Sequence, residues 1–257
     1  MKKFSILLPC FNGEKYLEQA IRSILDQDYK NWELIIIDGK STDGTHAIIN
    51  RYCQLDKRII WLKYDSSNFS AKLNHALMFA QGEIIGYIGF DDYYRQGIFK
   101  EVAHFLESHQ DCLWLYGNSY NVYPYAKSKL LFIKPPKKYS YHALFLSNFV
   151  GLQNCFFDKN VLVAAKFSEE NKYSQDYELW FRLIKICKPV YINAVVSYNT
   201  QDNNLSSGPM SGAQRLEAQA LAWKNAKTIL QKTLAWVGAS LVLGPVIYRL
   251  YKLIIAM

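Results

Sequence analysis

The sequence predicts an α/β fold: a mostly parallel central sheet flanked by helices, with a helical C-terminal extension. Short apolar runs rich in β-branched residues alternate with helical periodicity through roughly the first hundred residues, a pattern typical of parallel strands covered on both faces. The 257 residues, half of them hydrophobic, are enough for one enzyme-sized domain. We expect this domain over residues 1–205 and the basic, apolar extension over residues 206–257.

The first part of the chain is expected to hold four strands separated by helices. The strands are predicted over residues 4–8, 33–38, 59–62 and 83–90. Apolar residues at helical spacing predict helices around Leu17–Leu25, Ile48–Tyr52 and Leu73–Ala80. The expected caps are Asn12 for the first helix, Thr42 or Asp43 for the second, and Gly82 after the third.

The later elements follow a less regular rhythm. A helix is predicted over 95–109, a strand over 112–116, a helix around Tyr177–Ile184 and a strand over 190–194. Residues 127–138 hold five lysines and no acid, and a polar, turn-rich segment over 199–212 precedes the helical extension.

Charge and cysteine content narrow the function classes. The 30 Lys and Arg exceed the 22 Asp and Glu, which favours an anionic partner such as nucleic acid, a phosphorylated small molecule or acidic lipid. The five cysteines are dispersed, without a C-x-x-C pair, so we expect reduced thiols in a cytoplasmic protein rather than a zinc ribbon.

The C-terminal extension has two readings. Its uncharged run from Leu234 to Tyr248 is 15 residues long, shorter than the ~20 residues of a spanning helix. From Arg215 onward there are six basic residues and one acid, a composition suited to an anionic membrane surface. A helix packed on the protein's own core explains the apolar residues equally well.

Acidic residues follow several of the predicted strands. Asp38 and Asp43 follow the second strand, Asp91 and Asp92 the fourth, and Asp176 begins a later helix. Because parallel strands end at one edge of a sheet, these carboxylates are expected to converge on one crevice. Their repulsion must be offset there, and hard oxygen ligands suit Mg²⁺ or Mn²⁺ bridging the phosphates of a nucleotide.

Several enzyme classes lose support because their motifs are missing. The sequence contains neither G-x-x-x-x-G-K-[ST] nor G-x-G-x-x-G, and neither H-E-x-x-H nor G-x-S-x-G. P-loop nucleotidases, Rossmann dehydrogenases, zinc proteases and α/β-hydrolases are therefore disfavoured.

Four strings, in this order and at these separations, carry a family resemblance: SILLPCFNGEKYLEQAIRSILDQDY, ELIIIDGKSTDGT, AQGEIIGYIGFDDYY and SQDYELWFRL. Together they resemble the family 2 glycosyltransferases with the GT-A fold, of the type that makes bacterial cell-surface polysaccharides. The resemblance covers roughly residues 1–205.

The resemblance implies a donor-nucleotide site. Pro9 and the loop to Glu14, which includes Asn12, match the first nucleotide-binding turn. Asp38 matches the aspartate that reads the base, usually uracil, and an ionised carboxylate can accept the imide N–H. Asn74 matches an asparagine of the helix before the metal-binding strand. For Asp43 we favour helix capping, and for Lys72 a solvated lysine over a phosphate contact.

The resemblance also implies metal, catalytic and acceptor residues. Asp91 matches the last acid of the DXD motif and Asp92 the acid that follows it, whereas the first acid is replaced by Gly89. Asp176 matches the catalytic base. Gln153 resembles a position lining the acceptor site, and Trp180, one helical turn from Asp176, is either a sugar-stacking residue or part of the core.

We therefore expect an inverting glycosyltransferase that needs Mn²⁺ or Mg²⁺ and transfers a sugar from a nucleotide-sugar donor, UDP-linked, to a glycan or lipid-linked acceptor. An anionic membrane surface is a further expected partner through the C-terminus, and specific nucleic acid is not. Three alternatives stay open: a nucleotidyltransferase, a catalytically degenerate transferase, and a basic nucleic-acid- or membrane-binding protein whose acids are structural.

Overall fold

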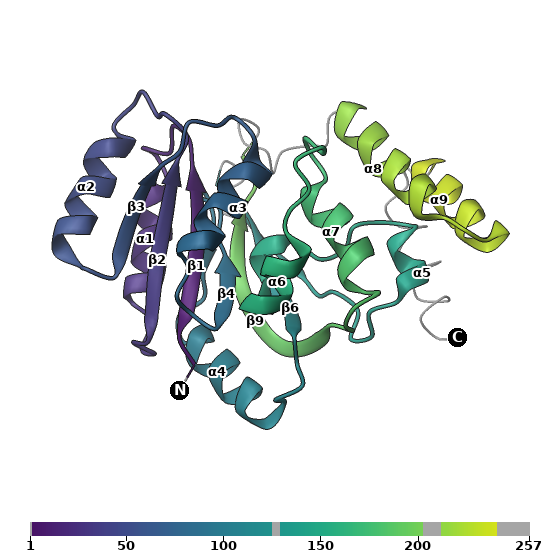
Figure 1. Ribbon diagram of the computed structural model, residues 1–257, viewed down its shortest axis with the longest axis horizontal. Coiled ribbons are helices and arrows are strands. Elements are labelled where there is room, and N and C mark those ends of the chain that lie inside the picture. Colours follow the sequence, from purple (N-terminus) through teal and green to yellow (C-terminus); the bar gives the residue numbers. More distant parts are fainter. Residues whose placement is uncertain (1, 125–128, 203–211, 241–257) are drawn as a thin grey trace.

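The computed structural model describes residues 2–124, 129–202 and 212–240. Within these ranges nine strands form one sheet, in the order β3-β2-β1-β4-β8-β6-β9-β5, with β7 paired to β6. Helices lie on both sides of this sheet (Figure 1), so the predicted α/β class is confirmed.

The N-terminal half supplies the parallel strands. They are β1 (Phe4–Cys10), β2 (Trp32–Asp38), β3 (Ile59–Lys63) and β4 (Ile84–Tyr87), with β1 between β2 and β4. The helices that connect them are α1 (Leu17–Leu25), α2 (Thr45–Leu55) and α3 (Phe69–Phe79). All four strands and three helices fall where periodicity predicts them.

The second half adds antiparallel pairs to the sheet. Its strands are β5 (Tyr93–Tyr94), β6 (Trp114–Tyr123), β7 (Lys129–Ile133), β8 (Cys155–Asp158) and β9 (Val190–Thr200). Its helices are α4 (Ile98–Ser108), α5 (Tyr141–Leu144), η1 (Leu152–Asn154), α6 (Lys159–Ala165), α7 (Gln175–Leu183), α8 (Gly212–Asn225) and α9 (Ile229–Ser240). Strand β8 runs antiparallel to β4 and β6, whereas β6 and β9 are parallel.

The strands contribute side chains to two hydrophobic cores, one on each face of the sheet. In β1, Phe4, Ile6 and Leu8 face a core that includes the buried sides of α1, α2 and α4, while Leu7 faces the core under α3, α6 and α7. Because successive side chains of a strand point to opposite faces, one apolar strand supports both layers.

All three predicted caps differ in the structure. The N-cap of α2 is Gly44, rather than Thr42 or Asp43. Helix α1 begins at Leu17 after Tyr16, because Asn12 adopts a left-handed backbone with φ 50° and belongs to the preceding loop. Helix α3 ends at Phe79, before Gly82, whose N–H bonds the Ser5 hydroxyl at 2.7 Å. A Cβ at Gly82 would lie 2.6 Å from the Lys3 carbonyl oxygen, so glycine permits this close approach to β1.

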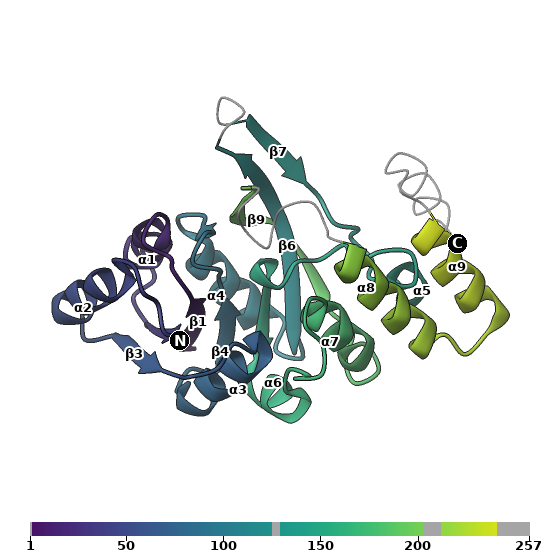
Figure 2. The same cartoon turned by 90° about the horizontal axis from the view of Figure 1, so that it is seen from above.

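The described part of the C-terminal extension packs on the main core. Leu221 and Ala222 of α8 and Leu234 and Ala235 of α9 join the core beneath α7, and both helices lie side by side at one end of the molecule (Figures 1 and 2). None of the helices within the described ranges is long and apolar enough to cross a membrane. Most of the uncharged run from Leu234 to Tyr248 lies outside the described residues.

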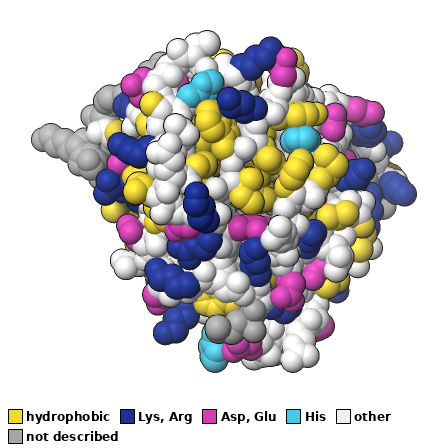
Figure 3. Space-filling view, turned by 60° about the vertical axis from the view of Figure 1, so that its left-hand side comes forward, with side chains coloured by type: hydrophobic (Ala, Val, Ile, Leu, Met, Phe, Trp, Pro, Cys, Tyr) yellow, Lys and Arg dark blue, Asp and Glu magenta, His cyan; other side chains and the backbone are white. Residues whose placement is uncertain are grey.

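The opposite end of the molecule exposes apolar side chains over α2 and α3. Leu55, Met78 and Phe79 are exposed, and the His75 ring stacks on Tyr64 at a centroid distance of 4.2 Å. On the face shown in Figure 3, apolar side chains gather near the middle, with Lys and Arg scattered among Asp and Glu. Positive charge on this face is therefore dispersed.

Candidate functional site

The candidate site lies where β1, β2 and β4 end. Pro9 is paired with Ile37 of β2, beyond Leu7, where the pairing of β1 with β4 stops. The missing N–H of Pro9 therefore costs no ladder bond, which is the position that proline tolerates in a sheet. After Cys10, where β1 ends, the chain forms the first loop of the site.

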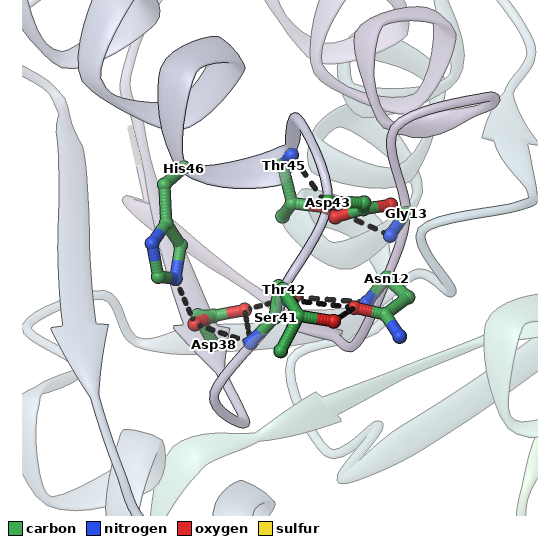
Figure 4. Close-up of polar contacts among 8 residues, drawn as sticks. All are labelled: Asn12, Gly13, Asp38, Ser41, Thr42, Asp43, Thr45 and His46. Atoms are coloured by element: carbon green, nitrogen blue, oxygen red, sulfur yellow. Dashed lines mark hydrogen bonds and ion pairs between the residues drawn. The ribbon is translucent and has the colours of Figure 1, made fainter.

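Two loops are fastened to each other at this edge. The N–H of Asn12 donates to the Ser41 hydroxyl at 2.9 Å, and the Thr42 N–H donates to Asn12 Oδ1 at 2.9 Å. The Gly13 N–H donates to Thr45 Oγ1 at 2.8 Å. Figure 4 shows these reciprocal contacts between the loops after β1 and β2. They fix the turn predicted to hold the nucleotide.

Acidic residues of both loops brace the same turn. Asp43 Oδ2 accepts from the Glu14 N–H at 3.1 Å, and Glu14 Oε2 accepts from the Gly44 N–H at 3.1 Å. Asp43 Oδ1 also accepts from the Thr45 N–H at 3.1 Å, at the start of α2. The N-cap of α2 is Gly44, without a side-chain cap hydrogen bond, so the predicted capping role of Asp43 is wrong. Asp43 and Glu14 instead brace the two loops against each other.

Asp38 ends β2 with a buried carboxylate. Ser41 donates its N–H to Asp38 Oδ2 at 3.2 Å and its hydroxyl to Oδ1 at 2.5 Å. His46 Nε2 lies 2.7 Å from Asp38 Oδ2 (Figure 4), and its ring lies beside Trp61 at a centroid distance of 5.2 Å. The carboxylate is thus held in a fixed orientation, and His46 is a partner that the sequence did not indicate.

Lys72 lies beside the Asp38 carboxylate and is buried. The prediction of a solvated lysine is therefore wrong. A Cβ at Gly39 would lie 2.2 Å from Lys72 Nζ, so glycine admits the lysine over the loop. Burial lowers the pKa of Lys72, and the charge of Asp38 opposes that shift. Lys72 therefore places a cation within the candidate nucleotide site.

The Cys10 thiol at the end of β1 is also buried beside these acids. Burial raises the pKa of Cys10 to about 12, and the charges of Asp38 and Asp43 add to the increase.

Asp91 and Asp92 follow β4 as predicted. Asp92 is buried, and its Oδ1 accepts from the Thr200 N–H at the end of β9 at 2.8 Å. Burial raises the pKa of Asp91 to about 6, and Asp202 adds to this increase. Burial, followed by the charge of Asp91, also raises the pKa of Asp92. Both pKa values are raised because the Asp91 and Asp92 carboxyl groups are removed from water at the carboxyl end of β4.

Asp202 is a site acid that sequence reasoning missed. It is buried after β9, where Tyr16 donates its hydroxyl at 2.6 Å and Lys15 Nζ lies 3.1 Å away. Its position in a polar, turn-rich segment gave no functional signal. Only the return of β9 to the end of β4 brings it near Asp91.

Asp176 begins α7 as predicted. Asn148 Nδ2 donates to its Oδ2 at 3.0 Å, and the Tyr177 N–H bonds Oδ1 at 2.7 Å. Burial raises the pKa of Asp176, while the Asn148 and Tyr177 bonds oppose the shift. The carboxylate is therefore held in place by neutral donors and keeps a greater proton affinity than an exposed aspartate.

The acids from distant segments converge around Tyr87 at the end of β4. Burial raises the pKa of Tyr87, and the carboxylates of Asp92, Asp91 and Asp176 each add to that increase. Electrostatic influence of this kind requires proximity. The donor loop adjoins the same place, since a Cβ at Gly13 would lie 2.9 Å from the Phe90 ring. Asp91, Asp92 and Asp176 thus lie near Tyr87, whereas the convergence of Asp38 and Asp43 with them stays a prediction.

Other predicted site residues have different surroundings. Asn74 Nδ2 donates to the Phe167 carbonyl at 2.9 Å, and the Phe167 N–H returns a bond of 2.8 Å to Asn74 Oδ1, so its amide fastens the chain before α7. Gln153 lies in η1, with its side-chain amide folded toward Gly151. Their nucleotide and acceptor contacts stay predictions.

Trp180 is fully buried. Its indole stacks on Trp114 at a centroid distance of 5.0 Å and donates Nε1–H to the Val150 carbonyl at 3.1 Å. An acceptor sugar has no face of this ring to stack on. The sugar-stacking prediction is therefore corrected to the core alternative.

Asp91 and Asp92 fit a divalent cation. A Cβ at Gly89 would lie 2.7 Å from Asp91 Oδ1 and 3.3 Å from Asp92 Oδ2, so the glycine leaves a cradle in front of both carboxylates. Among the residues described, no group of three or more His, Cys, Asp and Glu side chains is placed to hold a metal. Two carboxylates are enough for Mg²⁺ when substrate phosphates complete its coordination.

The braced loops, the buried Asp38 carboxylate and the acids near Tyr87 lie at the carboxyl end of the parallel strands, where open α/β folds place their ligand sites. Residues 5–162 match the family model for glycosyl transferase family 2. The chain belongs to that family.

Curated relatives are bacterial. TuaG of Bacillus subtilis, a putative teichuronic acid biosynthesis glycosyltransferase, is 26% identical over 82% of this chain and 84% of its own length. WcaA of Escherichia coli, a putative colanic acid biosynthesis glycosyl transferase, is 33% identical over 70% of this chain and 65% of its own. An uncharacterized glycosyltransferase of Rickettsia typhi is 27% identical, and the match spans 62% of its length.

Solved structures share the GT-A fold. The crystal structure of S. aureus TarS 1–349 in complex with UDP-GlcNAc has a TM-score of 0.70 and 20% identity, over 91% of this chain and 70% of that one. The mannosyltransferase PcManGT from Pyrobaculum calidifontis, in complex with GDP-Man and Mn²⁺, has a TM-score of 0.65 and 15% identity, over 99% and 74%. At these identities the likeness establishes the fold.

Proposed function

We propose that the chain is an inverting glycosyltransferase that transfers a sugar from a UDP-linked donor to a glycan or lipid-linked acceptor of a bacterial surface polysaccharide. The observation that carries this proposal is the position of Asp91 and Asp92 directly after β4, both within 3.3 Å of a Cβ placed at Gly89, beside the braced donor loop. Family membership and a neighbour solved with UDP-GlcNAc support it, as do relatives named for teichuronic and colanic acid biosynthesis.

Asp176 is the general base in this proposal. Inverting transfer requires the acceptor hydroxyl to lose its proton while its oxygen attacks the anomeric carbon from the face opposite the leaving diphosphate. A carboxylate held within hydrogen-bond reach of that hydroxyl performs this step. Asn148 orients Asp176 by its bond of 3.0 Å, and one displacement needs no covalent enzyme intermediate.

The donor occupies the braced loops after β1 and β2. Asp38 accepts the imide N–H of uracil, and Pro9, Asn12 and Glu14 shape the turn around the nucleotide. Lys72, whose Nζ lies over Gly39, is near enough to the same loop to attract the donor phosphates.

Asp91 and Asp92 would hold Mn²⁺ or Mg²⁺ in this proposal. Bound there, the cation would neutralise charge on the leaving diphosphate. The raised pKa values of both carboxylates are consistent with a site whose negative charge is balanced by a ligand.

We place the enzyme in the cytoplasm, attached to the inner face of the plasma membrane through its C-terminal helices. The net charge of +8 supports attraction to acidic lipid, and the exposed Trp223, Ile229 and Leu230 supply apolar contacts on α8 and α9.

Calorimetry with UDP, in the presence and absence of Mn²⁺, tests the donor and metal assignments together. We expect Mn²⁺ to strengthen UDP binding at least about 10-fold in the native chain. Without the cation, the carboxylates of Asp91 and Asp92 would repel the phosphates of UDP. Asp91→Asn should abolish that gain. If the protein binds duplex DNA in a salt-sensitive way and shows no binding of UDP, the transferase proposal is wrong and nucleic-acid binding is supported.

Turnover separates an active transferase from a degenerate one. Release of UDP from UDP-GlcNAc and other UDP-sugars, with water as the surrogate acceptor, should be measurable and should depend on Mn²⁺ or Mg²⁺. Metal-dependent UDP binding without any release from the full donor panel would contradict catalysis while leaving the donor site intact.

A further inference from the structure

A hollow of about 450 Å³ is lined by residues other than the acids around Tyr87. Its lining comes from the segment before α5, the residues after α7 and the turn between α8 and α9. The lining includes Tyr139, Tyr141, Lys185, Lys188, Lys227 and Gln231. The volume is sufficient for a phosphate group with its organic substituents.

The charge of this hollow is one-sided. Three of its lining residues are lysines and none is acidic. None of the three pairs with a carboxylate among the ion pairs of the described ranges. Lys185 and Lys188 lie just beyond the C-terminus of α7, where cations favour the helix dipole. Lys227 lies just beyond the C-terminus of α8 in the same way. The two helix dipoles favour each lysine separately, but they do not explain why all three border one hollow.

The turn that carries Lys227 is fixed. The buried Gln231 accepts at Oε1 from the N–H of Lys227 at 2.7 Å and from the N–H of Thr228 at 3.1 Å. Thr228 Oγ1 in return accepts from the Gln231 N–H at 3.2 Å. The backbone of Lys227 is thus held at the edge of the hollow before any ligand arrives, which reduces the entropy cost of binding.

Apolar side chains stand next to this basic hollow. Ile229 is 85% exposed and Leu230 is 57% exposed, and both follow Lys227 in the same turn and first residues of α9. In a membrane surface, exposed aliphatic side chains would enter the hydrocarbon layer, and the neighbouring lysines would bind the phosphates of the headgroups. A soluble phosphate would use the lysines alone and leave the aliphatic residues without a function.

We propose that this hollow binds the phosphate of an anionic membrane lipid while Ile229 and Leu230 enter the interface. This inference rests on the peripheral attachment proposed above and assigns it a site. Helix α7 runs from Asp176 near its start to the hollow beyond its end, and nine residues at 1.5 Å each span about 13 Å. Docking here therefore holds the general base close to the membrane surface.

Vesicle cosedimentation of the full chain tests the site. We compare vesicles of phosphatidylglycerol and phosphatidylcholine with vesicles of phosphatidylcholine alone. The triple variant Lys185→Gln, Lys188→Gln and Lys227→Gln is matched by a control, Lys57→Gln, Lys63→Gln and Lys100→Gln, which removes the same charge from exposed positions elsewhere. Thermal unfolding verifies that both variants are folded.

We expect the hollow variant to bind the anionic vesicles about 10²-fold more weakly than the native chain, since each lysine near a surface contributes about fivefold. The control should lose no more than about threefold, because distant charges are screened. Ile229→Ser with Leu230→Ser should weaken binding to the same vesicles while leaving the lysines in place. Equal losses in the two lysine variants would overturn the assignment.

Two further outcomes separate the sources of failure. If the native chain ignores anionic vesicles but retains UDP-sugar turnover, the peripheral attachment fails and the transferase proposal stands. If the hollow variant loses binding of inorganic pyrophosphate in calorimetry yet keeps native vesicle binding, the hollow takes a soluble phosphate and the lipid assignment is wrong.

Discussion

The carboxylate of Glu217 accepts a hydrogen bond of 2.7 Å from the backbone N–H of Ser174, two residues before Asp176. The same carboxylate accepts from the N–H groups of Lys172 at 3.0 Å and Tyr173 at 2.9 Å. Glu217 belongs to α8, beyond the residues 5–162 that match the family model. A helix of the C-terminal extension therefore fixes the start of the helix that carries the proposed base.

Glu217→Ala should loosen the segment before α7. Three backbone N–H groups lose an ionised acceptor, so we expect the free energy of unfolding to fall by about 1–3 kcal/mol, as for other charged hydrogen bonds. Urea denaturation measures this change. Turnover should also fall, with little change in the Kd for UDP, because the donor loops lie elsewhere.

Glu170→Gln is the matched control, because Glu170 is exposed in the same segment. It should change neither stability nor turnover appreciably. Glu217→Gln retains one acceptor oxygen and should fall between the control and Glu217→Ala. Native stability in Glu217→Ala would contradict the positioning role.

Asp176→Asn should reduce turnover by about 10²-fold or more, the usual contribution of a general base. The Kd for UDP should remain close to the native value, since Asp176 faces the acceptor in our proposal. Steady-state release of UDP and calorimetry measure the two effects. A variant with native turnover would exclude Asp176 as the base.

The same substitution should leave stability unchanged or increased near neutral pH. Burial raises the pKa of Asp176 above its ordinary value of 3.8, so the folded state holds this proton more tightly than the unfolded chain. The resulting contribution to stability is present below the unfolded pKa and is lost as pH rises through the folded pKa. An asparagine carries no such charge, and thermal unfolding at pH 7 should detect the difference.

Asn148→Ala should move the acid limb of the pH–rate profile to higher pH. Its amide donates to Asp176 Oδ2 and so favours the ionised carboxylate, and removing it should raise the pKa of Asp176 further. Activity then requires a higher pH to ionise the base. Asn160→Ala, on the exposed face of α6, is the control. An unmoved acid limb in Asn148→Ala would argue that another group titrates.

Asp38→Asn should weaken UDP binding about 10-fold, because a charged acceptor bonds the imide more strongly than a neutral one. Binding of pyrophosphate should be unchanged, which separates the base contact from the phosphate contacts. Asp26→Asn, at an exposed position after α1, controls for loss of charge. Equal weakening of UDP and pyrophosphate would place Asp38 near the phosphates instead.

Local patterns were sufficient to predict the first four strands and the acids that follow two of them. Apolar alternation and helical spacing act within a few residues, so they predict β1 to β4 and the positions of Asp38 and Asp91 at one edge. Asp176 was assigned its role through the resemblance. The short strands β5, β7 and β8 were not predicted, and Gly44 rather than Asp43 caps α2.

Two partners of those acids come from distant parts of the chain. Asn148 is 28 residues from Asp176, and Thr200 is 108 residues from Asp92, so no short window of sequence contains either pair. His46 is only 8 residues from Asp38, but no sequence pattern indicated that their side chains meet. The burial of Lys72 and Trp180 depends on which elements pack over them.

The sequence by itself determined the α/β class, the strands β1 to β4 and the acids that follow β2 and β4, because periodicity and residue type are local properties. Only the tertiary structure decided which donors hold each carboxylate, that Asp202 joins them, and that α8 reaches Ser174. Hydrogen bonding and desolvation depend on distances between segments that are remote along the chain, and folding sets those distances.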